Sequence, residues 1–152
     1  MLDMEKKIKI RVLSIREEYF DICSDALPTQ KDECNNIYTM FAINFEIDKE
    51  RSLLKATLWT NLFLPSKEDI PIVSYSFSYT LHIDPIQTLF SKVEGNQIDI
   101  KLPTDMASVI LTDMYAAARA LLSVKLSGTI LNDYYLPFDG AAQLIENIRV
   151  NQ

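Results

Sequence analysis

Between Ile72 and Asp84 the chain alternates without a slip between large apolar or aromatic side chains and a set dominated by serine and other polar residues. A period of two that is rich in aromatic and β-branched residues predicts a strand with one dry face and one wetter face. Strands of parallel sheets are buried on both faces and are continuously apolar instead. This stretch therefore predicts an antiparallel sheet that is covered on one side only, which leaves a broad surface for partners.

Three further stretches have the character of strands. Residues 7–23 keep one apolar phase up to Val12 and shift phase at Leu13, which predicts a bulge that bends the strand. Residues 37–48 and 53–64 both alternate, and the short polar link between them predicts a hairpin. The sheet is therefore expected to have four mostly antiparallel strands.

Helical signals follow the strands. Pro85 and Gly95 bound a short stretch that is expected to be helical. A long helix is predicted from about Thr104 to Leu126, because its apolar residues recur at helical spacing. Asp139 is expected to cap a last helix. We predict a single α+β domain over residues 1–152: a four-stranded antiparallel sheet from about 7–84, followed by helices from about 85–150 packed on one face.

Composition excludes several classes of protein. At 152 residues, with 48% hydrophobic and 24% charged residues, the chain can bury a core without disulfide or metal staples. The net charge of −6 argues against nucleic-acid binding, which needs a basic surface. The spacing of Cys23 and Cys34 matches no zinc pattern, so we expect two reduced thiols in a cytoplasmic protein. We expect no signal peptide, no membrane span, no metal and no cofactor.

The inventory of catalytic groups is poor. His82 is the one histidine, and it lies on the serine-rich phase of a strand. Glu17 and Glu18 are neighbours in a strand, so their side chains point to opposite faces and cannot share a proton or a metal. Three glycines cannot form a phosphate-binding loop. We therefore expect a protein that is not an enzyme.

Several apolar residues allow two interpretations. Trp59 and Phe63 lie on the more polar phase of their strand, where they are either exposed binding anchors or covered by a neighbouring subunit or by the loop 24–36. Met106 and Met114 either line an adaptable surface or fill the core. The alanines of the long helix mark a contact between subunits or a close approach to the sheet of the same chain.

The order of the elements and several local patterns resemble the SecB family of protein-export chaperones, over Ile8 to Ile148. The patterns that carry the resemblance are Phe20–Asp21 near the end of the first strand, Leu102–Pro103 before the long helix, Arg119 within it, Ser127–Gly128 after it, and Leu136–Pro137–Phe138–Asp139 before the last helix. The segment between Arg119 and Pro137 looks longer than in the typical bacterial exporter.

The resemblance implies a homo-oligomer, either a dimer formed through strand edges or a tetramer in which two dimers meet through the long helices. Such an assembly holds unfolded polypeptides in apolar grooves without ATP and passes them to SecA. On this sequence, the resemblance places the acidic SecA-docking residues at Glu17 and Asp21; the alternative is that both belong to a solvated strand face.

The resemblance also implies a groove for polypeptide clients between the loop 24–36 and the final segment, and the aromatic residues of the third strand are added as anchors. The client-binding residues predicted in this way are Leu27, Pro28, Trp59, Phe63, Leu136, Phe138 and Leu144. Three functions remain open: a holdase that serves export, a SecB-like chaperone of one client such as an antitoxin, and a small-ligand or protein-interaction module. A small-ligand module would show a closed apolar cavity.

Overall fold

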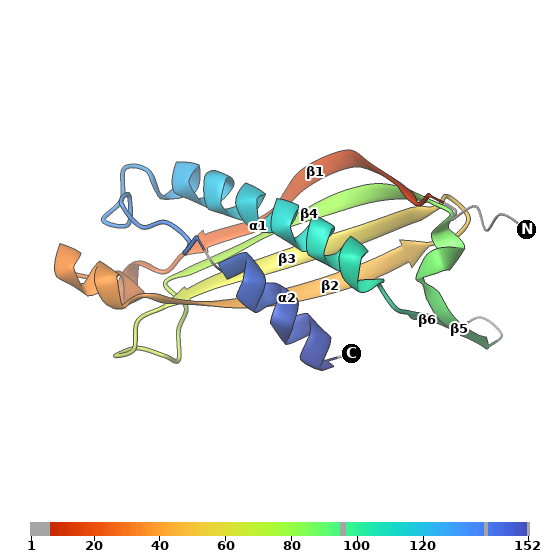
Figure 1. The fold of residues 1–152 in the computed structure, drawn as a ribbon. Helices are drawn as coiled ribbons and strands as arrows, with labels where there is room; N and C mark the ends of the chain where they lie inside the picture. Colours follow the sequence, from red (N-terminus) through yellow and green to blue (C-terminus); the bar gives the residue numbers. More distant parts are fainter. Residues whose placement is uncertain (1–6, 95–96, 139, 152) are drawn as a thin grey trace, which may run out of the picture.

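The computed structural model describes residues 7–94, 97–138 and 140–151. Four long strands form one antiparallel sheet in the order β1-β4-β3-β2, and both helices lie over the same face of it (Figure 1). The bounds are Lys9–Ile22 for β1, Tyr38–Asp48 for β2, Leu53–Phe63 for β3, Val73–Asp84 for β4, Thr104–Leu126 for α1 and Gly140–Asn151 for α2. The predicted α+β architecture is confirmed.

Short elements connect the long ones. The crossover from β1 to β2 contains two 3-10 turns, Ser24–Ala26 and Lys31–Asn36. After β4 comes a 3-10 turn, Ile86–Leu89, and then a hairpin of β5 (Phe90–Glu94) and β6 (Gln97–Ile100).

The prediction of a helix between Pro85 and Gly95 is therefore wrong, except for the single 3-10 turn Ile86–Leu89. Ile86 and Leu89 are both buried, and this spacing fits one turn of a helix but cannot show how far the helix continues. From Phe90 onward the residues pair across a hairpin instead. Gly95 and Asp139, which were expected to end one helix and to cap another, lie outside the described residues.

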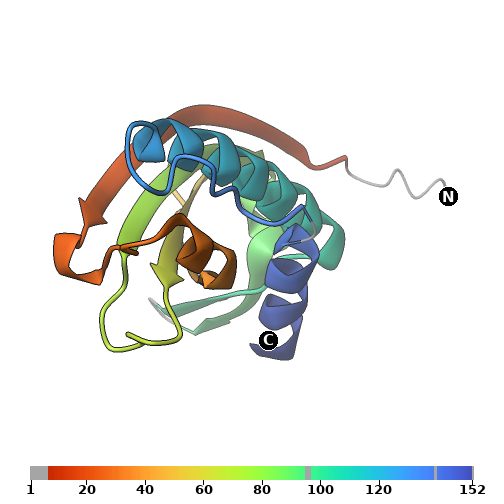
Figure 2. The ribbon, with the colours of Figure 1, turned by 90° about the vertical axis from the view of Figure 1, so that its left-hand side faces the viewer.

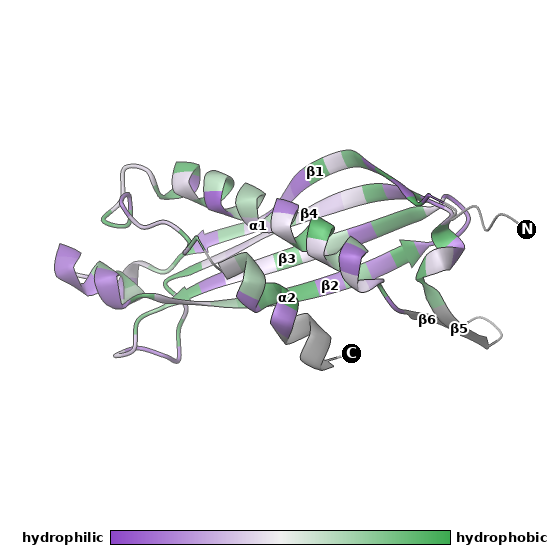
Figure 3. Cartoon of the chain, viewed as in Figure 1, coloured by the Kyte–Doolittle hydropathy of each residue, from purple (hydrophilic) through white to green (hydrophobic). Residues whose placement is uncertain are grey.

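The core lies between the helices and the two central strands. The helix-facing residues of β3, from Leu54 to Leu62, are all fully buried, and so is Phe77 at the centre of β4. Met106 and Met114 of α1 are buried among them, which supports core filling. The strands show this two-faced character as alternating hydrophobic and hydrophilic bands (Figure 3).

The outer face of β4 is drier than its serines suggested. Ser76 is directly paired with Tyr19 of β1 on one side and with Trp59 of β3 on the other. The rings of Tyr19 and Trp59 have centroids 5.7 Å apart, and Ser76 is 0% exposed. A serine is too small to reach past two large neighbours, so the aromatic rings shield the middle of this face from water.

The predicted bulge of β1 is confirmed. Its pairing with β4 shifts between Val12 and Ser14 and again between Glu17 and Tyr19, and the strand arches over the sheet (Figure 1). β1 is an edge strand, and nearly all its side chains are exposed.

Helix α1 has the predicted bounds. Gly128, with φ of +82°, adopts the left-handed conformation that follows many helix ends. By length and composition alone, α1 is apolar enough to cross a membrane, and it is the one such helix in the described part of the chain. Asp113 and Arg119 lie within the helix, so its sequence contains no unbroken apolar run of the length that a membrane span needs. Its buried residues, such as Leu111 and Ala118, pack in the core of the fold.

Candidate functional site

A groove separates the crossover from the segment that follows α1. We call it the crossover groove; its first hollow has a volume of about 460 Å³. The two walls are far apart in sequence but lie side by side in the end-on view (Figure 2). The residues that line this hollow are Lys31, Cys34, Asn35, Ile37, Ile130, Asp133, Tyr134, Tyr135 and Pro137.

Two polar contacts tie the walls together at one end. Lys31 Nζ lies 2.6 Å from the Asp133 carboxylate, and both side chains are well exposed. The Cys34 thiol donates to the Ile130 carbonyl oxygen at 3.7 Å. Burial raises the pKa of the Cys34 thiol, with the nearby Glu33 carboxylate adding to the effect, so this sulfur stays protonated and behaves as part of the apolar wall.

A second hollow of about 250 Å³ continues the groove toward the sheet and shares Ile37, Tyr134 and Pro137 with the first. The Tyr134 hydroxyl is hydrogen-bonded to Thr39 Oγ1 at 2.9 Å, which fixes the ring against β2. Burial raises the pKa of Tyr134. At the back, Phe41 meets the ring of Tyr115 edge-on, with centroids 5.6 Å apart.

The floor of the groove is held by α1. Both the Tyr115 hydroxyl and Arg119 Nη2 donate to the carbonyl oxygen of Pro137, the latter at 3.1 Å. The Arg119 guanidinium lies 5.5 Å from the centroid of the Phe138 ring, which is itself 91% exposed. These hydrogen bonds hold the segment in place, and the Phe138 ring presents aromatic surface to solvent, which suits the binding of apolar polypeptide side chains.

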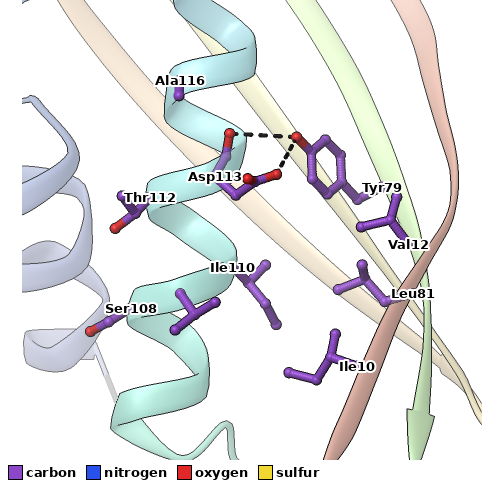
Figure 4. Close-up of a pocket in the computed structure, with 10 residues that line it drawn as sticks. Ile10, Val12, Tyr79, Leu81, Ser108, Ile110, Thr112, Asp113 and Ala116 are labelled. Atoms are coloured by element: carbon purple, nitrogen blue, oxygen red, sulfur yellow. Dashed lines mark hydrogen bonds between the residues drawn. The ribbon is translucent and has the colours of Figure 1, made fainter.

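A separate cleft lies between β1 and α1, with a volume of about 650 Å³ (Figure 4). Its walls carry Ile10 and Val12 from β1 and Val109 from α1, all three exposed. At one end, the Tyr79 hydroxyl donates to an Asp113 carboxylate oxygen at 2.8 Å. Burial and this hydrogen bond raise the pKa of Tyr79, which keeps the hydroxyl a donor. We call this the β1–α1 cleft.

The client-binding residues predicted from the sequence occupy different environments. Leu136 and Leu144 are each 3% exposed and belong to the core of the chain itself. Pro28 is buried, and Leu27 is half-buried against the core. Phe138 alone among these five presents most of its surface to solvent, and it follows directly after the groove residue Pro137.

Trp59 and Phe63 lie on the outer face, across the sheet from the crossover groove. Each is half-buried under one aromatic neighbour: Trp59 beside Tyr19, and Phe63 stacked on Tyr38 with centroids 5.6 Å apart. The structure therefore does not bring them together with the crossover and the final segment.

Glu17 and Asp21 also face different sides of the sheet. Glu17 is paired with Phe77 on the helix side, where it accepts a hydrogen bond from Tyr75 and forms an ion pair with Lys125 at 2.9 Å. Asp21 is paired with Ser74, on the outer face. Directly paired residues share a face, so these two carboxylates do not form one acidic surface.

The predicted client-binding residues do not include most of the residues that line this groove. Cys34, Ile37, Ile130 and the pair Tyr134–Tyr135 form part of its surface, together with the polar residues Lys31, Asn35 and Asp133. The segment that contains Tyr134 and Tyr135 was expected only to be extended and apolar. Within the described residues, no group of three or more histidine, cysteine, aspartate or glutamate side chains is placed to hold a metal ion.

Comparisons with known proteins bear on the fold. No family model matches the chain, and no curated protein matches it. Among solved structures, it is similar to the SecB-like chaperone Rv1957 of Mycobacterium tuberculosis, solved in complex with a ChAD peptide from the Rv1956 HigA1 antitoxin. That match has a TM-score of 0.57 and 11% identity, and covers 85% of this chain and 90% of the other.

A protein of unknown function from Streptococcus agalactiae matches with a TM-score of 0.43 and 14% identity, over 87% of this chain and 99% of the other. That score is too low to support an argument. At 11% identity, the match to the mycobacterial chaperone shows the fold, which is SecB-like as the sequence predicted.

Proposed function

We propose that this protein is an ATP-independent chaperone that holds extended apolar segments of unfolded polypeptides in the crossover groove. The observation that carries the proposal is the open aromatic groove on a SecB-like fold. Its wall is partly polar, and the apolar and aromatic members, such as Ile37, Ile130 and Tyr134, provide affinity for many sequences, because apolar contact discriminates little between them.

Between an export role and service to a dedicated client, we favour the dedicated client. The predicted acidic docking pair for SecA, Glu17 and Asp21, is divided between the two faces of the sheet. The SecB-like structure that this fold matches was solved with an antitoxin peptide. The two half-buried free cysteines suit a reducing compartment, so we place this activity in the cytoplasm.

We further propose that the protein is a homo-oligomer and that a second copy covers β1 and the β1–α1 cleft. The free edge of β1 carries exposed apolar residues, among them Val12, Leu13 and Ile15. An edge strand of this kind promotes association unless it is covered. On α1, Val109 lines the same cleft and is 65% exposed.

The test of the holding activity is suppression of aggregation. A chemically unfolded, reduced polypeptide is diluted into buffer without nucleotide, with and without an equimolar amount of the chaperone, and light scattering is followed. We expect the wild-type protein to slow aggregation and a Tyr135→Ser, Phe138→Ser double variant to need at least about fivefold more protein for the same effect, since both rings are largely exposed.

The matched control is Ile70→Ser, which removes an exposed apolar side chain from the loop before β4, outside the groove. It should behave as the wild type. A folded protein that fails to slow aggregation, or a control that loses as much activity as the double variant, contradicts the proposal. Co-elution with SecA that is abolished by Asp21→Lys would favour the export role instead.

A further inference from the structure

The electric charge of the crossover groove is the feature from which this inference starts. The chain as a whole is acidic, with a net charge of −6. Among the described residues, the two hollows of the groove have two charged residues in their lining, Lys31 and Asp133, and these form an ion pair with each other. The described lining is therefore neutral. The inference rests on the proposed function and concerns which client segments the groove prefers.

Arg119 lies directly behind this lining. Its Nη2 atom donates to the carbonyl oxygen of Pro137, a residue that lines both hollows. Its guanidinium carbon lies 5.4 Å from the centroid of the Tyr115 ring and 5.5 Å from that of the Phe138 ring. One carbonyl group and two rings therefore hold a half-buried cation at the floor of the groove.

No carboxylate of the described chain forms an ion pair with Arg119, since each ion pair between described residues involves another cation. A guanidinium keeps its charge throughout the physiological pH range. Nη2 bonds to Pro137, and Nε is the one donor of this side chain that is buried without a partner among the described residues. Nη1 is therefore open to solvent. The described part of the groove floor carries one unbalanced positive charge that a ligand can reach.

The exposed ring beside this charge affects what can bind there. Phe138 is 91% exposed, so an apolar or aromatic side chain of a client can pack on it. A cation is attracted to the face of a ring, but a second cation near the same ring is repelled by the first. A carboxylate has the opposite preference, because it accepts charge-assisted hydrogen bonds from a guanidinium. The pair Arg119–Phe138 therefore discriminates between client side chains by their charge.

We propose that Arg119 is a specificity-determining residue, which favours client segments in which a carboxylate flanks an apolar or aromatic residue and disfavours segments with lysine or arginine in that place. The apolar residue packs on Phe138, and the carboxylate accepts from the guanidinium. This preference opposes the field of the whole molecule, because a chain with a net charge of −6 attracts cationic peptides over longer distances. A preference for acidic segments therefore requires a local cause.

The experiment compares three fluorescent ten-residue peptides by anisotropy. They share the same apolar residues around a central phenylalanine and differ only in its two flanking residues, which are both glutamate, both glutamine or both lysine. We expect the glutamate peptide to bind at least about fivefold more tightly than the glutamine peptide, and the lysine peptide to bind more weakly than both. The differences should shrink at high salt, because salt screens charges.

Three variants separate the charge of Arg119 from its other contacts. Arg119→Met removes the charge and should bind all three peptides with similar affinity, close to that of the wild type for the glutamine peptide. Arg119→Lys keeps the charge and should keep the order of the three peptides. Lys49→Met removes the same charge from the exposed turn between β2 and β3 and should bind like the wild type.

Comparing the peptides on one protein separates specificity from stability, since a less stable variant loses affinity for all three alike. Equal binding to the wild type, or a preference for the lysine peptide, overturns the inference, while continued suppression of aggregation leaves the proposed function standing. A glutamate preference that survives in Arg119→Met also overturns it. So does a folded Arg119→Met variant that loses the glutamine peptide as well, because Arg119 then only positions the segment. If the wild type binds none of the peptides, the inference fails.

Discussion

At the scale of single residues, Glu17 shows how partners change a role inferred from sequence. Its carboxylate accepts a hydrogen bond from Lys125 and another from Tyr75, and the interaction with Lys125 is the largest cause that lowers its pKa below the ordinary value of 4.5. Glu17 connects β1 to the last turn of α1, where Lys125 also lies 5.4 Å from the centroid of the Phe20 ring. The residue therefore has a structural role in the single chain.

The pH dependence of Glu17→Gln follows from this lowered pKa. A carboxyl group with a lower pKa in the folded state stabilises the fold above its unfolded pKa, and loses this effect as the pH falls through the folded pKa. We expect the variant to lose up to about 1 kcal/mol of unfolding free energy at pH 7, because the pair is partly exposed. The loss should shrink as the pH falls through the lowered pKa that Glu17 has in the folded state, as measured by urea unfolding at pH 7 and at a series of pH values below 4.5.

Glu50→Gln is the matched control, because it removes the same charge from the exposed turn after β2. It should change the unfolding free energy little at any of these pH values. A difference between Glu17→Gln and the wild type that persists unchanged at low pH would show that the ion pair is not its cause.

At the scale of elements, the start of α2 depends on a glycine. A Cβ added at Gly140 would lie 2.7 Å from a ring carbon of Tyr115 and closer still to its hydroxyl end. Tyr115 is buried, and its hydroxyl donates to the Pro137 carbonyl oxygen, so the ring has little room to move. α2 can therefore pack closely on α1 only because this position has no side chain.

We expect Gly140→Ala to destabilise the protein by about 1–3 kcal/mol, as overpacking of a filled core does. The measurement is thermal or urea unfolding. Gln143→Ala, at an exposed position of the same helix, is the control and should have little effect. Equal stability of the two variants would contradict the close approach of α2 to Tyr115.

At the scale of the whole molecule, two surfaces have different expected partners. The β1 edge and the β1–α1 cleft are assigned to a second copy, and the crossover groove to the client. We expect Val12→Arg, at a 46% exposed position in the cleft, to shift the mass measured by light scattering toward the monomer without unfolding the chain. A buried arginine without a partner at the interface would oppose association.

Ile70→Arg places the same charge at a 48% exposed apolar position in the loop before β4 and should leave the mass unchanged. A wild-type protein that is already monomeric at micromolar concentration would contradict the proposed oligomer. So would a Val12→Arg variant that keeps the wild-type mass.

The sequence by itself determined the strands, the long helix and the layered α+β architecture. Each of these is a local property of the chain. The alternation between Ile72 and Asp84, the phase slip at Leu13 and the helical spacing after Pro103 all show in the sequence which side of a strand or helix faces the core. The failure after Pro85 also has a local cause, because a short apolar run fits one turn of a helix and the start of a hairpin equally well.

Only the tertiary structure decided which surfaces come together. The groove joins Cys34 and Ile37 to Ile130 and Tyr134, which are about a hundred positions away in the chain, and no local period encodes that pairing. Glu17 and Asp21 are four positions apart and would share a face in a regular strand, but the register shift between Glu17 and Tyr19 puts them on opposite faces. A residue's partners across the fold decide whether it is buried, paired or available for binding, and those partners are set by packing.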